Sequence, residues 1–160
     1  MIVYKALGVI GIIFSGLWFY VVCEGFQKKK SAQLDSFIEL VSYMRNQIKC
    51  YMMPIDSVFK GCSKSILVKC GYFNDSVPKN LEELLNNSVF YIDNESEIYL
   101  NNLAKSFGTV YFNEQIKLCD DCLNELNKIR EKNTLKRKKD RKVSLAICIS
   151  MSLSLILILI

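Results

Sequence analysis

Two uncharged apolar blocks, one towards each end of the 160-residue chain, constrain its structure more than any other feature. The first runs from Ala6 to Cys23 and the second from Val143 to Ile160, eighteen residues in each case. An α-helix rises about 1.5 Å per residue, so each block would cover roughly 27 Å, close to the hydrocarbon thickness of a bilayer. The sequence therefore predicts transmembrane helices over residues 2–23 and 143–160.

The first block is longer than the apolar region of a secretory signal peptide, and no Ala-x-Ala-like cleavage site follows it. Cys23 ends the block as the cysteine of a lipoprotein signal would. However, the residue before it is the β-branched Val22, where a small residue is expected. We therefore expect a helix that is retained.

Basic residues flank both blocks on the side of the segment between them. Lys28, Lys29 and Lys30 follow the first block, and six lysines and arginines within residues 136–142 precede the second. By the positive-inside rule, residues 27–135 form a cytoplasmic domain, and residues 136–142 are a basic juxtamembrane segment. The expected location is the cell membrane, with two helices crossing it.

The net charge of +5 comes from these two clusters. Residues 31–135 carry 11 basic and 14 acidic side chains, a balance of −3. The surplus cations lie where anionic lipid headgroups would attract them. We therefore expect contacts with membrane lipids and no binding of nucleic acid.

Between the blocks, apolar residues recur at steps of three and four, the spacing of an amphipathic helix. The longest run predicts a helix of about five turns that ends at Pro54, which can also open the next helix. The inward face of this helix would comprise Leu34, Phe37, Ile38, Val41, Met44, Ile48 and either Tyr51 or Met52.

Further helices are predicted from cap residues and spacing. Asp75 or Ser76 would cap one helix, and Asp93 or Asn94 would cap the next. A last helix would begin at about Phe112 and continue into the second block. The residues expected to be buried in the two capped helices are Leu81, Leu84 and Leu85, then Ile98, Leu103 and Phe107. The expected fold is all-α, a bundle of about five or six helices between the transmembrane helices.

The sequence contains seven cysteines and no histidine, and therefore lacks the commonest general base and metal ligand. Cys119 and Cys122 have the spacing of a redox or metal pair, but the two aspartates between them would raise the pKa of either thiol. Both fall on the apolar face of their helix, which favours a packing role, with thiol redox chemistry as the alternative. We expect no enzymatic activity, no metal and no cofactor.

Small residues recur at four-residue intervals in both apolar blocks. Ala146, Ser150 and Ser154 form such a row in the second block, and Gly11 and Ser15 have the same spacing in the first. These rows predict close packing between the two membrane helices or between the subunits of a homo-oligomer. The alternative is that the serines hydrogen-bond to carbonyls of their own helix.

The overall pattern resembles the stage III sporulation protein AB family of spore-forming bacteria. Shared features are the terminal apolar helices, the basic patch, the long amphipathic helix that ends in Tyr51-Met52-Met53-Pro54-Ile55, and Phe107-Gly108 followed by Gln115. The resemblance implies a helical domain like that of the platform protein of type II secretion systems. It also implies a mother-cell membrane location and partners in a cytoplasmic secretion-type ATPase and other stage III sporulation membrane proteins.

The resemblance favours a non-enzymatic scaffold of the channel between mother cell and forespore. The candidate partner interface is the end of the long helix, around Tyr43, Tyr51 and Pro54, because exposed aromatic side chains often mark contacts. The alternative is a holin-like or stress-related membrane protein with a regulatory cytoplasmic domain. The apolar blocks carry no ionisable side chain, which argues against a solute path through them.

Overall fold

The computed structural model describes the backbone of residues 2–51 and 55–159, with the side chains of residues 8, 11, 14–51, 57–151 and 154. Among these residues there is no β-strand, and the one ladder-like contact is an isolated antiparallel bridge between Tyr72 and Ser88. The predicted all-α fold is therefore confirmed for the described part of the chain.

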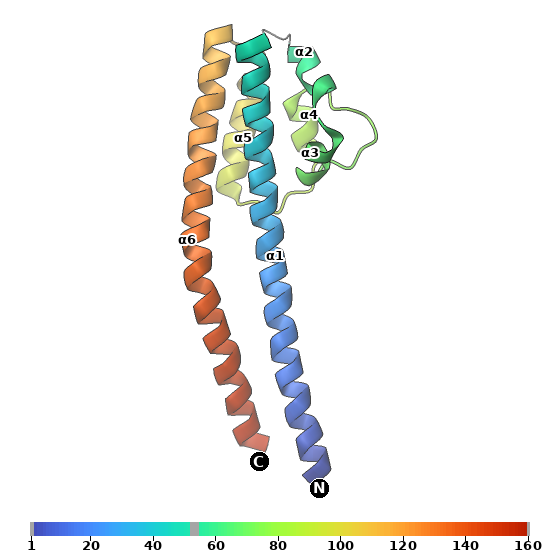
Figure 1. The fold of residues 1–160 in the computed structure, drawn as a ribbon, viewed down its shortest axis with the longest axis vertical. Coiled ribbons are helices and arrows are strands. Elements are labelled where there is room, and N and C mark those ends of the chain that lie inside the picture. Colours follow the sequence, from blue (N-terminus) through green and yellow to red (C-terminus); the bar gives the residue numbers. More distant parts are fainter. Residues whose placement is uncertain (1, 52–54, 160) are drawn as a thin grey trace. The chain divides into compact units, whose positions relative to one another are not determined.

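The helices differ greatly in length (Figure 1). Two long ones begin and end the chain, and short ones lie between them. Their bounds are α1 Ile2–Tyr51, α2 Ile55–Val58, the 3₁₀ turn η1 Phe59–Gly61, α3 Lys64–Lys69, α4 Leu81–Asn86, α5 Asn94–Ser106 and α6 Phe112–Leu159.

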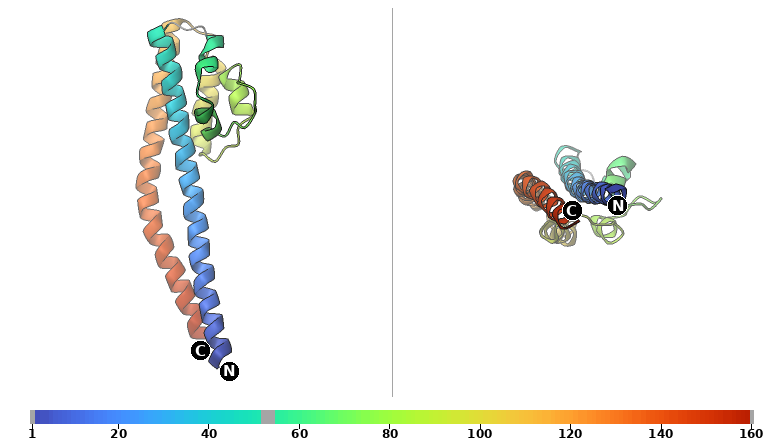
Figure 2. Two further views of the ribbon diagram at one scale, coloured as in Figure 1. Left: turned by 45° about the vertical axis from the view of Figure 1, so that its right-hand side comes forward. Right: turned by 90° about the horizontal axis from the view of Figure 1, so that it is seen from below.

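The chain divides into two compact units, each of which takes part of both long helices. The central unit comprises residues 29–132, and the terminal unit comprises residues 1–28 and 133–160. Within the central unit, α1 and α6 run side by side, and the short helices α2, α3 and α4 lie on the side of α1 away from α6 (Figures 1 and 2).

The core of the central unit is built on one face of α1. Six side chains of this face are almost fully buried, at the three- and four-residue steps that define a helical stripe: Leu34, Phe37, Leu40, Val41, Met44 and Ile48. The predicted amphipathic helix is thus confirmed. Tyr51 does not extend the stripe, because its side chain is 69% exposed. Met52 and Pro54 lie outside the described residues.

The remaining helices close this core from both sides of α1. Each contributes apolar side chains that are largely inaccessible to solvent. These side chains include Val58, Phe59, Leu67, Leu81, Leu84, Leu85, Leu100, Leu103, Leu126 and Ile129. Ile98 was expected to point inward but is 58% exposed, and Leu100 takes the core position instead. Leu103 and Phe107 are buried as predicted, so Ile98 alone was misplaced: it lies two residues from Leu100 and therefore on a different side of the helix.

The predicted cap of α4 at Asp75 or Ser76 is wrong, and the cap is Asn80. The side-chain oxygen of Asn80 accepts a hydrogen bond from the backbone N–H of Glu83 at 2.8 Å. The Glu83 carboxylate reaches back to accept the backbone N–H of Lys79, also at 2.8 Å. This reciprocal arrangement resembles a capping box and satisfies donors that a helix start leaves open. For α5, Asp93 occupies the predicted cap position.

A buried glutamine connects two loops of the central unit to α1. The amide nitrogen of Gln33 donates to the carbonyl oxygens of Cys70 at 2.8 Å and Val89 at 2.6 Å. The amide oxygen of Gln33 accepts the backbone N–H of Tyr91 at 2.6 Å. Buried backbone groups in loops are costly unless they are paired, so this one side chain stabilises both loops at once.

Gly71 lies within this arrangement in a conformation that L-residues rarely adopt. Its φ is +98°, and a Cβ at this position would lie 2.4 Å from the carbonyl oxygen of Val89 and 2.7 Å from the amide nitrogen of Gln33. Its carbonyl oxygen also accepts the backbone N–H of Val89 at 3.0 Å. Glycine is therefore required here for both backbone conformation and space.

We expect Gly71→Ala to destabilise the protein markedly, because it adds a clash to the roughly 1–2 kcal/mol that the left-handed conformation costs an alanine. Chemical denaturation of the full chain in detergent, followed by far-UV circular dichroism, measures the change. Gly25→Ala is the matched control, since nothing lies within 4 Å of a Cβ at that position in α1. Equal stability of the two variants would contradict this account of Gly71.

Candidate functional surfaces

The paired cysteines of α6 are part of the core. Cys119 and Cys122 are both buried, and the Cys122 thiol lies 3.9 Å from the carbonyl oxygen of Tyr99 as a weak donor. Burial raises the pKa of Cys119 and of Cys122 to about 12 in each case. Redox-active cysteines need a stabilised thiolate, so these surroundings favour the packing role over thiol chemistry. Within the described residues, no group of three or more acidic or cysteine side chains is arranged to hold a metal ion.

The adjacent aspartates of α6 have different surroundings. The Asp120 carboxylate pairs with the guanidinium of Arg45 on α1, with one contact from Arg45 Nε and a second from Nη2 to Oδ2 at 3.3 Å. Hydrogen bonding to Asp120 raises the pKa of Arg45 above its ordinary value. Asp120 therefore connects the two long helices through a two-point contact.

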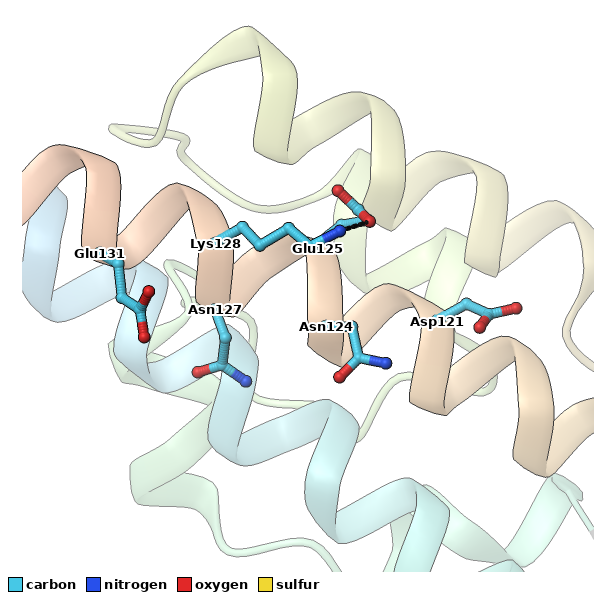
Figure 3. A pocket seen from close by; sticks show the side chains of 6 residues that line it. All are labelled: Asp121, Asn124, Glu125, Asn127, Lys128 and Glu131. Atoms are coloured by element: carbon cyan, nitrogen blue, oxygen red, sulfur yellow. Dashed lines mark hydrogen bonds and ion pairs between the residues drawn. The ribbon is translucent and has the colours of Figure 1, made fainter.

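Asp121 instead belongs to a polar surface on the outside of α6 (Figure 3). Its other members are Asn124, Glu125, Asn127, Lys128 and Glu131, all from this one helix. The Lys128 ammonium donates to Glu125 at 2.6 Å, and this contact raises the pKa of Lys128. The surface is a solvated helix face, and all of its described lining residues come from α6.

The three residues of the predicted partner interface have different positions. Tyr43 is half-buried, packs against the core, and donates its hydroxyl to the carbonyl oxygen of Val58 at 3.3 Å. Tyr51 is exposed at the last residue of α1, and Pro54 lies outside the described residues. Tyr43 thus has a structural role, whereas Tyr51 is available for contact.

Figure 1 shows the end of α1 and the start of α6 at the same end of the central unit, and two further aromatic residues lie at that start of α6. Tyr111, just before α6, is 85% exposed, and Phe112 at the start of α6 is also exposed. We call Tyr51, Tyr111 and Phe112 the aromatic end. Tyr111 belongs to no apolar periodicity. In the sequence, only its position between Gly108 and the predicted start of the helix indicates that it is exposed.

A groove of about 520 Å³ lies beside the first turns of α1 in the central unit. One wall is a stripe of α1 that begins at Lys29 and includes Gln33. The other is formed by the end of α3 and by the two loops that Gln33 holds. Val68, Lys69, Phe73 and Tyr91 contribute exposed side chains to this second wall. We call this feature the α1 groove; no sequence motif indicated it, because its walls come from three distant segments.

The terminal unit is held together by polar contacts between its two helical segments. Arg137 Nη2 donates to the Glu24 carboxylate at 2.7 Å, and Arg141 Nε donates to the Tyr20 hydroxyl at 3.0 Å. The hydrogen bond from Arg137 lowers the pKa of Glu24. Exposed cationic side chains of Lys138, Lys139 and Lys142 lie on the same stretch of α6.

The predicted small-residue rows lie in this unit. Ser150 and Ser154 donate hydrogen bonds to carbonyl oxygens of their own helix, those of Ile147 at 3.0 Å and Ser150 at 2.9 Å. Ala146 is exposed, as are Gly11 and Ser15 in α1. Helix packing through these rows stays a prediction.

Large apolar side chains in this unit point to the exterior. On α1 they include Phe14, Leu17, Trp18, Phe19, Val21, Val22 and Phe26, and on α6 Val143, Leu145, Ile147, Ile149 and Met151. Among the residues that the structure describes, no helix is long and apolar enough to cross a membrane.

Fold and surfaces together define an all-α protein whose candidate sites, in the described part of the chain, are interaction surfaces. The chain belongs to the stage III sporulation protein AB family, whose family model matches residues 5–160. It is therefore a sporulation-related protein. Neither the curated proteins nor the solved structures include one with significant similarity to the chain.

The raised pKa values of Cys119 and Cys122 predict a pH dependence of stability. A thiol with a pKa of about 12 when folded and about 9 when unfolded binds its proton more tightly in the folded state. Its contribution is fully present below pH 9 and is lost as pH rises from 9 to 12. Urea unfolding at pH 8, 9.5 and 11 should show this decline, and Cys119→Ala/Cys122→Ala should make it shallower. The buried thiol of Cys70, whose pKa burial also raises, should retain part of the decline. An unchanged slope in the double variant would contradict the assignment.

Proposed function

We propose that this protein is a membrane scaffold subunit of the apparatus that joins mother cell and forespore, and that its central unit docks a cytoplasmic secretion-type ATPase. The observation that carries the proposal is the family match over residues 5–160. A scaffold needs anchoring segments and an exposed contact surface. The sequence and the described surfaces offer a candidate for each.

The anchoring segments of this proposal are the two apolar blocks, which would cross the cell membrane as helices. Support comes from the sequence of both blocks, including residues whose side chains lie outside the described set, and from the apolar side chains that the terminal unit exposes. Outward-facing apolar groups over several turns are unfavourable in water and favourable in lipid. The neighbouring lysines and arginines favour a cytoplasmic central unit.

The contact surface of this proposal is the aromatic end. Tyr51, Tyr111 and Phe112 offer large apolar area at little conformational cost, as interface anchors do. They project from the ends of two helices whose positions are fixed by the core and by the pairing of Arg45 with Asp120. A rigid helical domain that presents such a cluster is suited to binding a protein partner rather than to catalysis.

The proposed topology predicts the labelling of Cys50, an exposed thiol in the central unit. A maleimide that cannot cross membranes should leave Cys50 unlabelled in intact cells and label it after permeabilisation. Cys50→Ser is the matched control that identifies the signal from this position. Labelling of Cys50 in intact cells would contradict a cytoplasmic central unit.

The proposed docking surface predicts a selective effect of Tyr51→Ala. Loss of an aromatic anchor at an interface should weaken capture of the ATPase by the purified full chain roughly tenfold or more. The same variant should reduce a late forespore reporter in sporulating cells. Ile98→Ala removes an apolar side chain of similar exposure from α5 and should leave both readouts unchanged. Unimpaired capture by a folded Tyr51→Ala protein would remove the aromatic end from the proposal.

A further inference from the structure

The α1 groove combines apolar and cationic groups in an arrangement that the docking proposal does not use. Phe73 is 66% exposed, and Val68 and Tyr91 are exposed beside it. Lys29 and Lys69 line the same groove with exposed side chains. Exposed aromatic and aliphatic groups next to lysines are the composition of surfaces that lie in the headgroup region of a membrane.

The backbone that presents these apolar side chains is held firmly. Each of them is next to a buried residue of the core: Val68 to Leu67, Phe73 to Tyr72, and Tyr91 to Ile92. Gln33 also bonds the carbonyl oxygens of Cys70 and Val89 and the backbone N–H of Tyr91. These apolar side chains are therefore exposed because burial of their neighbours fixes the backbone. Their exposure to water costs free energy unless another surface covers them.

The charges along α1 favour an anionic surface near Lys29. Its neighbour Lys30 is paired with Asp93. The acidic groups of the groove wall, Asp35 and Glu39, lie six and ten residues after Lys29. On a helix these distances are about 9 Å and 15 Å. Lys29 also follows the end of the proposed membrane segment, Cys23, by six residues. The headgroup layer is roughly 5–7 Å thick on each side of the hydrocarbon core, so the chain keeps Lys29 within reach of it.

We propose that the α1 groove rests on the membrane surface, with Phe73 and Tyr91 in the headgroup region and Lys29 and Lys69 against anionic phospholipid phosphates. This inference rests on the proposed membrane location. It assigns the two ends of the central unit to different tasks. Lys29 at the groove and Tyr51 at the aromatic end are separated by 22 residues of α1, or about 33 Å of helix. Contact at the groove restrains the domain on the membrane and leaves the aromatic end for a protein partner.

The single tryptophan of the chain, Trp18, allows a direct test. The full chain is reconstituted into vesicles of phosphatidylcholine, with or without phosphatidylglycerol, that contain phospholipids brominated near the headgroup. Bromine quenches tryptophan only at close range. The tryptophan of the wild type reports on the proposed membrane helix. The variant Trp18→Phe/Phe73→Trp places the single tryptophan in the groove, and the matched control Trp18→Phe/Tyr111→Trp places it at the aromatic end.

We expect quenching of the wild type and of the Phe73→Trp variant, at least threefold weaker quenching of the Tyr111→Trp variant, and stronger quenching at the groove when phosphatidylglycerol is present. Lys29→Gln or Lys69→Gln should each lower the ratio of docked to undocked groove roughly fivefold in anionic vesicles. Lys105→Gln and Lys117→Gln, exposed lysines outside the groove, should not.

The outcomes separate this inference from the proposed function. An unquenched wild type would overturn the membrane location and the inference with it. Quenching of the wild type without quenching at the groove would overturn the inference alone. Equal quenching of the groove and control variants would also overturn it. So would a groove signal that depends on the protein-to-lipid ratio and not on lipid charge, because a second copy of the chain would then cover the groove.

Discussion

Burial of one face of α1 is the interaction on which the rest of the central unit depends. The stripe from Leu34 to Ile48 is contacted from one side by α6 and from the other by the short helices. A helix of four to six residues, such as α2, α3 or α4, is not stable alone, because nucleation costs more than so few hydrogen bonds return. These helices persist because residues such as Val58, Leu67 and Leu84 are buried against the long one.

Polar contacts then determine details that apolar burial leaves open. Gln33 holds two loops against α1, and Gly71 makes room for the close approach of those loops. Arg45 and Asp120 connect α1 with α6 in a defined register. Such pairings are directional, so they select one arrangement among the several that burial alone would allow. Both candidate surfaces of the central unit rest on this framework, the groove on Gln33 and the aromatic end on the two long helices.

Sequence reasoning succeeded where a signal is local and repeated. The apolar stripe of α1, the start of the last helix at Phe112 and the buried positions of Cys119 and Cys122 all follow from steps of three and four. It failed where neighbouring positions compete. Asp75, Ser76 and Asn80 are all competent cap residues, and only the contact between Asn80 and Glu83 decides among them. Ile98 is apolar, yet α5 turns Leu100 towards the core.

The sequence by itself determined the class of the protein, namely an all-α chain of the stage III sporulation protein AB family. Two uncharged blocks, two basic clusters and one long periodic helix are properties of composition and spacing, which need no knowledge of distant contacts. Tertiary structure alone decided which residues meet: Gln33 with Cys70 and Val89, Arg45 with Asp120, and Lys29 with the wall around Phe73. These partners lie dozens of residues apart, and the physical reason that they meet is the collective packing of the core, which no local pattern records.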